Sequence, residues 1–211
     1  MGNHDIWIVP AGQGVFALVT PGRWPHVLAM TLIASERRYQ GRVIHLDLDT
    51  VEFPDGSSGQ LEMVRHPGAS AVVPLLDDPG APDPRVLLIR QFRHAADGYL
   101  WEIPAGRREP DETSDECARR ELLEETGMRA GRMSALTTVY TTPGFTDEQI
   151  HLFLASGLEE GRHRREPDEF MEVHILPWSD VLSMMERGEI QDAKTLVALM
   201  YAGLYRGVGR R

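Results

Sequence analysis

The sequence predicts an α+β protein in which a small antiparallel β-hairpin precedes a larger domain built on a central sheet. Three observations support this expectation. Residues 42–64 alternate between apolar and polar side chains on both sides of a turn at 54–56, which is typical of two antiparallel strands. The apolar runs 69–76 and 86–89 have the length and composition of buried strands. Residues 113–127 carry the capping signals of an α-helix.

The second half of the chain continues with strands and then helices. Residues 133–140 and 149–155 favour strands because apolar and polar residues alternate there. Two helices are expected after them, from about 179 to 187 and from about 192 to 205, and the second has apolar residues spaced to face a core.

Length and composition indicate one globular domain with an added arm, because the chain has 211 residues and 42% of them are hydrophobic. We expect an N-terminal extension over 1–38, a β-hairpin over 39–66 and the main domain over 67–211. Two interpretations of the extension stay open. Either it is an arm that packs on the domain or on a partner, or the protein starts at Met30 and the preceding residues are upstream read-through. A two-stranded hairpin is marginally stable by itself, so the predicted hairpin must pack on the main domain or on another subunit.

Charge and composition argue against several classes of protein. The net charge of −10 disfavours a surface that coats nucleic acid. Cys117 is the only cysteine, which excludes an intrachain disulfide and a thiolate metal cluster. Lys194 is the only lysine, and it lies in an ordinary helical stretch. No apolar run approaches the roughly 20 residues of a membrane span. The residues before the short apolar stretch 27–34 lack the basic start of a signal peptide, so we expect a cytoplasmic protein.

The first predicted helix carries a cluster of carboxylates. A capping box at 113–116 begins it, and Gly127 lies where a left-handed C-terminal cap belongs. Because an α-helix turns by about 100° per residue, Glu121, Glu124 and Glu125 project from one face. Like charges at this spacing repel by roughly a few tenths of a kcal/mol per pair, so cations are expected among them. The alternative is a solvated surface helix with a charged face.

The residues around this helix follow a fixed pattern. Gly106 is followed after five residues by Glu112, and after seven more by Arg120-Glu121-Leu122-x-Glu124-Glu125-x-Gly127-Met128. This pattern resembles the Nudix box with every defining position filled, and the chain is identified on it as a member of the Nudix hydrolase family. The resemblance implies a Nudix α/β/α sandwich with a mixed central sheet. It also implies metal-dependent hydrolysis of nucleoside diphosphates linked to another moiety.

Further segments resemble the ADP-ribose pyrophosphatases of that family. These enzymes carry a proline about fifteen positions past the box, and Pro143 follows Met128 by 15 positions. The likeness runs from about Tyr39 to Ala202 and includes the segments 39–43, 66–69, 90–93, 100–106, 143–148, 188–190 and 192–195. It implies that ADP-ribose and water give AMP and ribose 5-phosphate. It also implies a homodimer that shares the N-terminal hairpin across its interface.

The expected metal site follows from the chemistry of a phosphoanhydride, whose attack by water builds negative charge on oxygens that already repel one another. Two or three Mg²⁺ or Mn²⁺ ions would neutralise that charge and lower the pKa of a bound water. Their expected ligands are Glu121, Glu124, Glu125 and the backbone carbonyl of Ala105. Arg120 is expected to orient this cluster by pairing with a carboxylate.

The water needs a base as well, and the box offers no free one. A glutamate in the polar loop 157–170 is therefore expected to take the proton when substrate is bound. By resemblance to the same pyrophosphatases that base is Glu169, with Glu166 and Glu172 as alternatives.

Substrate recognition is expected outside the box. Arg93, at the end of a buried strand, is placed to bind a phosphate with two hydrogen bonds, and a plain surface arginine is the alternative. Glu102 would accept from a substrate hydroxyl or join the metal ligands, and Phe145 and Glu148 would contribute to selectivity. Other functions stay open, namely hydrolysis of ADP-glucose or GDP-mannose, ligand sensing without catalysis, and docking of a protein partner on the acidic helix.

Overall fold

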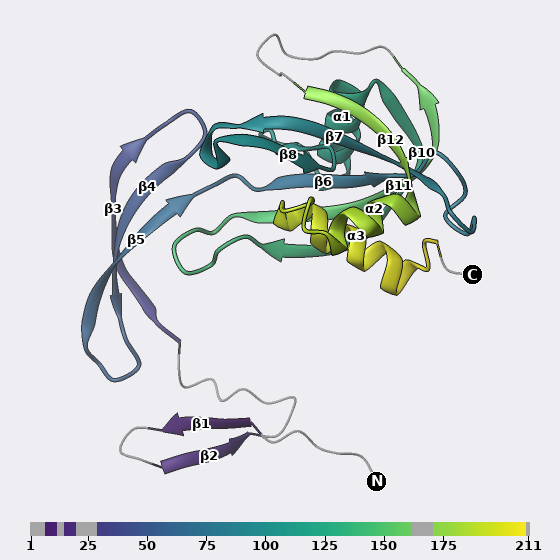
Figure 1. Cartoon of the computed structure of the whole chain (residues 1–211). Helices are drawn as coiled ribbons and strands as arrows, with labels where there is room; N and C mark the ends of the chain where they lie inside the picture. The colour runs from purple at the N-terminus through teal and green to yellow at the C-terminus, as the bar shows by residue number, and fades with distance from the viewer. Residues whose placement is uncertain (1–6, 12–14, 20–28, 162–170, 210–211) are drawn as a thin grey trace. The chain divides into compact units, whose positions relative to one another are not determined.

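The computed structural model describes residues 7–11, 15–19, 29–161 and 171–209 (Figure 1). The chain divides into two compact units, of which the first consists of Met1–Tyr39 with Leu46–Met63 and the second of Gln40–His45 with Val64–Arg211. Within the described ranges, no helix is long and apolar enough to cross a bilayer.

The first unit contains two small sheets. Strand β1 (Trp7–Ala11) pairs antiparallel with β2 (Val15–Val19). A separate three-stranded sheet has the order β3-β4-β5, with β3 at Thr31–Gln40, β4 at His45–Glu52 and β5 at Ser58–Arg65. β4 and β5 are the two strands that the alternation over 42–64 predicts.

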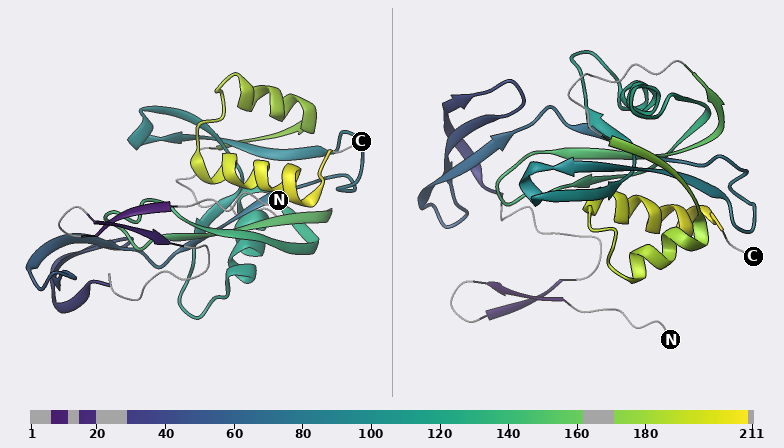
Figure 2. Two further views of the ribbon diagram at one scale, coloured as in Figure 1. Left: turned by 90° about the horizontal axis from the view of Figure 1, so that it is seen from below. Right: turned by 45° about the horizontal axis from the view of Figure 1, so that its top comes forward.

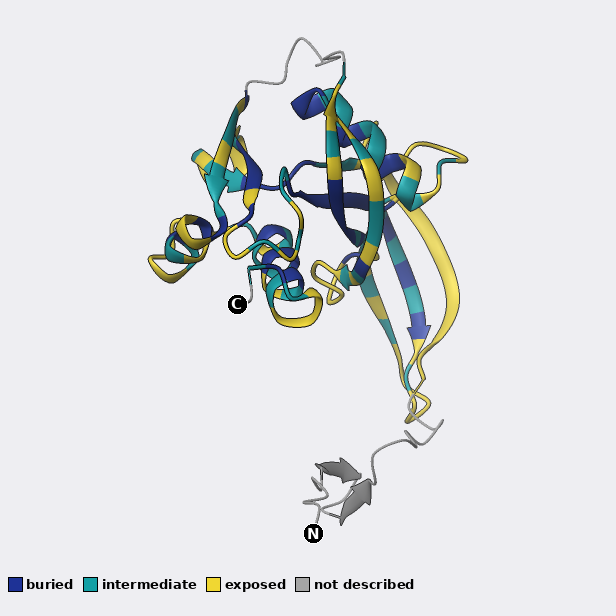
Figure 3. Ribbon diagram, turned by 90° about the vertical axis from the view of Figure 1, so that its right-hand side faces the viewer, coloured by how far each residue is buried: buried dark blue, intermediate teal, exposed yellow. Residues whose placement is uncertain are grey.

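The sequence pattern did not predict strand β3. Its sequence, TLIASERRYQ, shows no regular alternation, and each of its residues is exposed (Figure 3). The strand is held by pairing with β4 and by side-chain contacts. The hydroxyl of Ser35 donates to Asp49 at 2.6 Å, and Arg37 forms an ion pair with Asp47. Residues of β4 therefore hold β3 in place, and the sequence of β3 alone contains no sign of these contacts.

The second unit is built on two sheets. One has the order β10-β11-β6-β9, and it is mixed because β11 pairs parallel with β6 while β10 and β9 pair antiparallel with their neighbours. The other is antiparallel with the order β12-β7-β8. The strand bounds are β6 Ala69–Pro74, β7 Arg85–Arg93, β8 Gly98–Glu102, β9 Ala105–Arg107, β10 Met128–Tyr140, β11 Gln149–Glu160 and β12 Met171–Pro177. The expected mixed central sheet is confirmed.

Helices cover both faces of these sheets. In the described part of the unit they are α1 (Ser114–Thr126), α2 (Trp178–Glu186) and α3 (Ala193–Arg206), with a short 3₁₀ turn at His94–Ala96. Figure 2 (right) shows α1 on one side of the sheets and α2 and α3 on the other. The predicted α/β/α sandwich is therefore confirmed.

Strand β6 is buried on both faces and so joins two apolar clusters. Val73 packs with residues of α2, α3 and β7, whereas its neighbour Val72 packs with Ala118 and Leu122 of α1. Successive side chains of a strand point to opposite faces, so a continuous apolar run suits this central position. The same strand pairs with β9. Because α1 packs on β6 and β9 is hydrogen-bonded to β6, this strand positions α1 and β9 relative to one another.

Candidate active site

Helix α1 has the caps that the sequence predicts. The hydroxyl of Thr113 accepts from the backbone N–H of Glu116 at 3.3 Å, and the Glu116 carboxylate accepts from the N–H of Thr113 at 2.9 Å. Gly127 ends the helix with a φ of 74°, a conformation that glycine adopts readily. Ala118 and Leu122 are fully buried against the sheet, so the helix is anchored by its apolar side.

Two glutamates of α1 lie against the backbone of β9. The exposed fractions of Glu121 and Glu125 are only 8% and 3%. The Glu125 carboxylate accepts from the N–H of Ala105 at 3.0 Å. A Cβ atom at Gly106 would lie 2.0 Å from a carboxylate oxygen of Glu121, so this close approach requires glycine.

Arg120 compensates much of the charge on this face. Its Nε and Nη2 donate to Glu112 at 2.8 and 2.9 Å, while its Nη1 donates to Glu121 at 2.6 Å and to Glu124 at 3.0 Å. The hydrogen bonds to Glu112, and after them the interactions with Glu121, raise the pKa of Arg120. The hydrogen bond from Arg120 likewise lowers the pKa of Glu112. The repulsion among these carboxylates, which led us to expect cations, is thus relieved in part by a guanidinium.

The donor atoms on this face suit a hard divalent cation. Glu121 and Glu125 offer carboxylate oxygens beside the backbone of Ala105, and Mg²⁺ and Mn²⁺ prefer oxygen ligands. The side chain of Glu124 is 31% exposed. Among the described residues, no three His, Cys, Asp or Glu side chains are grouped closely enough to hold a metal ion. The residues therefore fit such an ion by chemical type, and further oxygen atoms are needed to complete its coordination.

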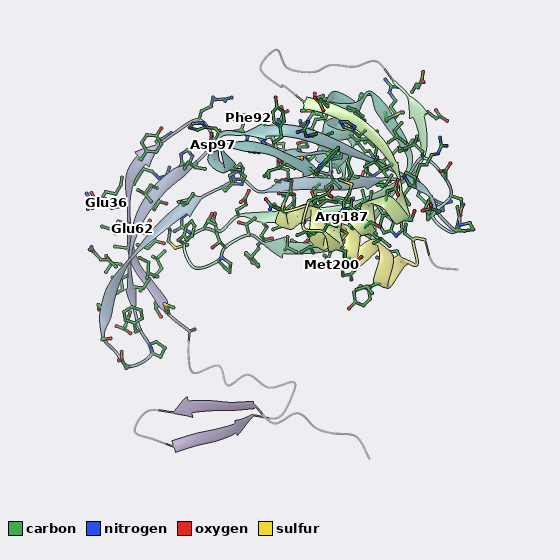
Figure 4. The ribbon with its side chains drawn as sticks, viewed as in Figure 1. Glu36, Glu62, Phe92, Asp97, Arg187 and Met200 are labelled. Atoms are coloured by element: carbon green, nitrogen blue, oxygen red, sulfur yellow. The ribbon has the colours of Figure 1, made fainter. Side chains whose placement is uncertain are left out.

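Arg93 and Glu102 form a pair at the edge of the second sheet, on the β7–β8 hairpin whose end Phe92 and Asp97 mark in Figure 4. Nε and Nη2 of Arg93 donate to the two oxygens of Glu102 at 2.6 and 2.8 Å. The side chain of Glu102 is 1% exposed and that of Arg93 is 40% exposed. Burial alone would raise the pKa of Glu102, but the hydrogen bond from Arg93 and the charge of Lys194 bring it below its usual value.

This pair is electrostatically linked to the face of α1. The pKa of Arg93 is raised chiefly by its hydrogen bond to Glu102, and the negative charge of Glu125 contributes to the same rise. The guanidinium of Arg93 is therefore held by Glu102 and half open to solvent. Both oxygens of Glu102 already accept hydrogen bonds, from Arg93 and Lys194.

Phe145 and Glu148 belong to a third group, in the loop between β10 and β11. The carbonyl of Phe145 accepts from the N–H of Val64 at 2.8 Å, and the residue as a whole is 53% exposed. The Glu148 carboxylate accepts from the hydroxyl of Thr141 at 2.9 Å and lies 3.4 Å from Nδ1 of His66.

The structure thus brings Arg120 into contact with Glu121 and Glu124, places Glu125 against Ala105, and joins Arg93 to Glu102. Phe145 and Glu148 contact residues 64–66. Glu169 and Glu166 lie outside the described residues. Glu172 on β12, the other alternative base, is paired with His174 of the same strand and with Arg90 of β7. The hydrogen bond from His174 lowers the pKa of Glu172.

A basic cavity beside the loop 107–111 was not predicted from the sequence. Its volume is about 620 Å³, and its charged or titratable lining residues are Arg42, Arg65, Arg107, Arg108, His45 and His66 together with the acidic Glu109 and Asp111. The arginines come from three separate segments of the chain, so no local run of positive charge indicates the cavity. A role for Lys194 was not predicted from the sequence either, although its being the only lysine sets it apart.

Comparisons with known proteins show which proteins this chain resembles. The family model of the NUDIX domain matches residues 65–199. An ADP-ribose pyrophosphatase of Bacillus subtilis is 40% identical over 174 residues, which cover 82% of this chain and 91% of that protein. A methanol dehydrogenase activator of Bacillus methanolicus is 37% identical with the same coverage. A GDP-mannose pyrophosphatase of Cronobacter sakazakii is 39% identical over 132 residues, covering 58% of this chain and 68% of that protein.

A solved structure described as an ADP compounds hydrolase superposes with a TM-score of 0.75 at 21% identity. The superposition covers 89% of this chain and all of the other. At that identity the likeness concerns the fold.

Proposed function

The chain belongs to the Nudix family, and from this membership we propose that it hydrolyses the pyrophosphate bond of ADP-ribose to AMP and ribose 5-phosphate. The observation that carries the proposal is the packing of α1 on β9, which brings Glu121 and Glu125 onto the backbone of Ala105 and Gly106. The relatives named ADP-ribose pyrophosphatase support the choice of substrate.

The proposed enzyme uses two or three Mg²⁺ or Mn²⁺ ions. Glu121 and Glu125 would hold them, with Glu124 and the carbonyl of Ala105. Bound there, the ions would neutralise charge on the diphosphate and acidify a water. Arg120 would keep the carboxylates in position through its hydrogen bonds to Glu112, Glu121 and Glu124.

Proton transfer and binding are assigned to residues that do not belong to α1. Arg93, held by Glu102, would bind a phosphate of the substrate with its exposed side. Glu169 would take the proton from the attacking water. Glu172 suits that role less, because its hydrogen bond to His174 makes it a weaker base and fixes it on β12. Phe145 and Glu148 would contribute to the choice of substrate.

A negatively charged substrate also suits the basic cavity beside the loop 107–111. Its arginines lie in a chain with a net charge of −10, and such a local positive field favours a diphosphate. The expected partner is therefore a small nucleoside diphosphate sugar.

We also propose a homodimer that shares the N-terminal hairpin. Support comes from β3, where the apolar side chains of Leu32, Ile33 and Tyr39 are 55–58% exposed. Large apolar side chains gathered on one strand are a common feature of interfaces. The cytoplasmic location expected from the sequence, and the absence of nucleic-acid and membrane partners, stay predictions.

The alternative substrate is another nucleoside diphosphate sugar, GDP-mannose or ADP-glucose. The relative named GDP-mannose pyrophosphatase favours it, because it is 39% identical over the residues matched. A ligand-sensing module without catalysis is a more distant alternative, and it predicts binding without turnover.

The decisive experiment is an assay of ADP-ribose, ADP-glucose and GDP-mannose with Mg²⁺, using the wild type, Glu125→Gln and Glu186→Gln. Glu186, exposed on α2, is the matched control. We expect the wild type and Glu186→Gln to turn over ADP-ribose fastest and Glu125→Gln to lose most of that activity. No turnover of any substrate, or full activity in Glu125→Gln, would show the catalytic proposal to be wrong. Faster turnover of GDP-mannose would replace the substrate and keep the reaction.

A further inference from the structure

Lys194, in the first turn of α3, is hydrogen-bonded to Glu102, the residue that pairs with Arg93. Nζ of Lys194 donates to Glu102 at 2.5 Å and to Asp192 at 3.0 Å. The side chain of Lys194 is only 13% exposed and that of Asp192 is 16% exposed. Lys194 and Glu102 are separated by 92 residues in the chain. A lysine that is mostly buried needs a fixed anionic partner, and Lys194 has two.

The cap of α3 fixes the position of this lysine. Asp192 is the N-cap residue, and its carboxylate accepts from the N–H and the hydroxyl of Thr195 at 3.0 and 2.6 Å. The hydroxyl oxygen of Thr195 in turn accepts from the N–H of Ile103 at 2.9 Å. The start of α3 is therefore bonded to the side chain of Glu102 and to the backbone of the next residue.

Charge decides what Lys194 adds to the pair of Arg93 and Glu102. Arg93 and Glu102 cancel one another, and with Lys194 and its second partner Asp192 the four groups stay neutral in sum. What Lys194 adds is a second cation on the Glu102 carboxylate, while the negative charge of Asp192 is also stabilised by the N-terminus of α3. Arg93 is thus oriented by a carboxylate whose charge is shared between two cations.

From these contacts we propose that Lys194 is a positioning residue of the active site. It holds Glu102 so that Arg93 presents its guanidinium to a phosphate of the substrate. The inference rests on the proposed function, because that phosphate belongs to the nucleoside diphosphate sugar. In this proposal Lys194 acts through Glu102 and Arg93.

Kinetics of two variants test the proposal. Lys194→Met keeps the apolar stem and removes the charge, so we expect KM for ADP-ribose to rise roughly tenfold with kcat changed by less than about twofold. Lys194→Arg keeps the charge and should restore KM to within about threefold of the wild type. The matched control is Arg187→Met, which removes a cation from an exposed pair with Glu189 and should leave KM unchanged. Thermal unfolding shows whether each variant is folded.

A spectroscopic measurement follows the network without turnover. Because Lys194 is the only lysine, protein grown with ¹³C-labelled lysine gives one set of lysine side-chain NMR signals. We expect Arg93→Ala to shift the Lys194 signals, because it removes the other cation on Glu102, and Arg187→Met to leave them in place. If Lys194→Met does not fold, Lys194→Arg and this measurement decide.

The possible failures can be told apart. No turnover of any nucleotide sugar by the wild type overturns the proposed function, and with it the role assigned to Lys194. Normal turnover by the wild type with an unchanged KM in Lys194→Met overturns the role of Lys194 alone. The same holds for a loss in kcat without a change in KM, and for lysine signals that Arg93→Ala does not move.

Discussion

Replacing Gly106 by alanine tests whether the approach of Glu121 to β9 is needed for function. The added Cβ atom would lie 2.0 and 2.4 Å from the two carboxylate oxygens of Glu121, and Cβ atoms essentially never come within 3.0 Å of a neighbour. The carboxylate must therefore move by about 1 Å. The backbone itself tolerates alanine, because Gly106 is not among the residues with positive φ.

The expected effects on activity and on stability differ. The group that must move is the far end of a flexible side chain, so the folded state loses about 0.5–1.5 kcal/mol, the cost of an unfavourable rotamer. A catalytic group displaced by about 1 Å can cost 10²-fold in rate, or ~2.7 kcal/mol in the barrier. We therefore expect Gly106→Ala to reduce kcat/KM about 100-fold and to remain folded.

Turnover of ADP-ribose and denaturant unfolding of the same preparations measure the two effects. The control is Gly203→Ala in α3, where the added Cβ would lie 3.4 Å from Trp178. It should keep full activity and gain about 0.5–1 kcal/mol, because glycine is a poor helix former. Full activity in Gly106→Ala would refute the reasoning, and so would a loss of stability large enough to account for the loss of activity.

Two further predictions concern ionisable groups. Burial raises the pKa of the Cys117 thiol to about 11. A thiol reagent at pH 8 should therefore label the native protein much more slowly than the denatured protein, and mass spectrometry can measure both rates. Equal labelling rates would contradict this prediction. Hydrogen bonds from Arg85 lower the pKa of Asp77 from 3.8 to about 2. Because the pKa is lower in the folded state, the pair stabilises the protein above about pH 4 and loses that contribution as the pH falls toward 2. Unfolding free energies of the wild type and Asp77→Asn, followed by circular dichroism, should therefore differ at pH 6 and converge near pH 2, and a gap that persists at pH 2 would count against the pair.

Local signals in the sequence were sufficient for α1. The capping box at Thr113 and Glu116 and the glycine at 127 act within a few residues of one another, so the sequence alone predicts both ends of the helix. The same holds for strands β4 and β5, whose alternation repeats every two residues. β3 lacked such a signal, and its pairing with β4 supplies what its own sequence does not.

The composition of the acidic face could also be predicted, but its charge balance could not. Sequence spacing places Glu121, Glu124 and Glu125 together because a helix repeats every 3.6 residues. That Arg120 reaches three carboxylates, including Glu112 in the preceding loop, depends on how that loop folds back onto the helix.

By itself the sequence determined the family and the residues of the helix that carries the acidic face, because these follow from spacing along the chain. The mixed sheet was implied by resemblance to the family. Only the tertiary structure decided which oppositely charged side chains form ion pairs. Lys194 forms an ion pair with Glu102, which lies 92 residues earlier in the chain. Arg93 pairs with the same carboxylate, and its side chain stays partly exposed to solvent. Such contacts arise when distant strands and helices pack around a common core, and no pattern within one segment specifies them.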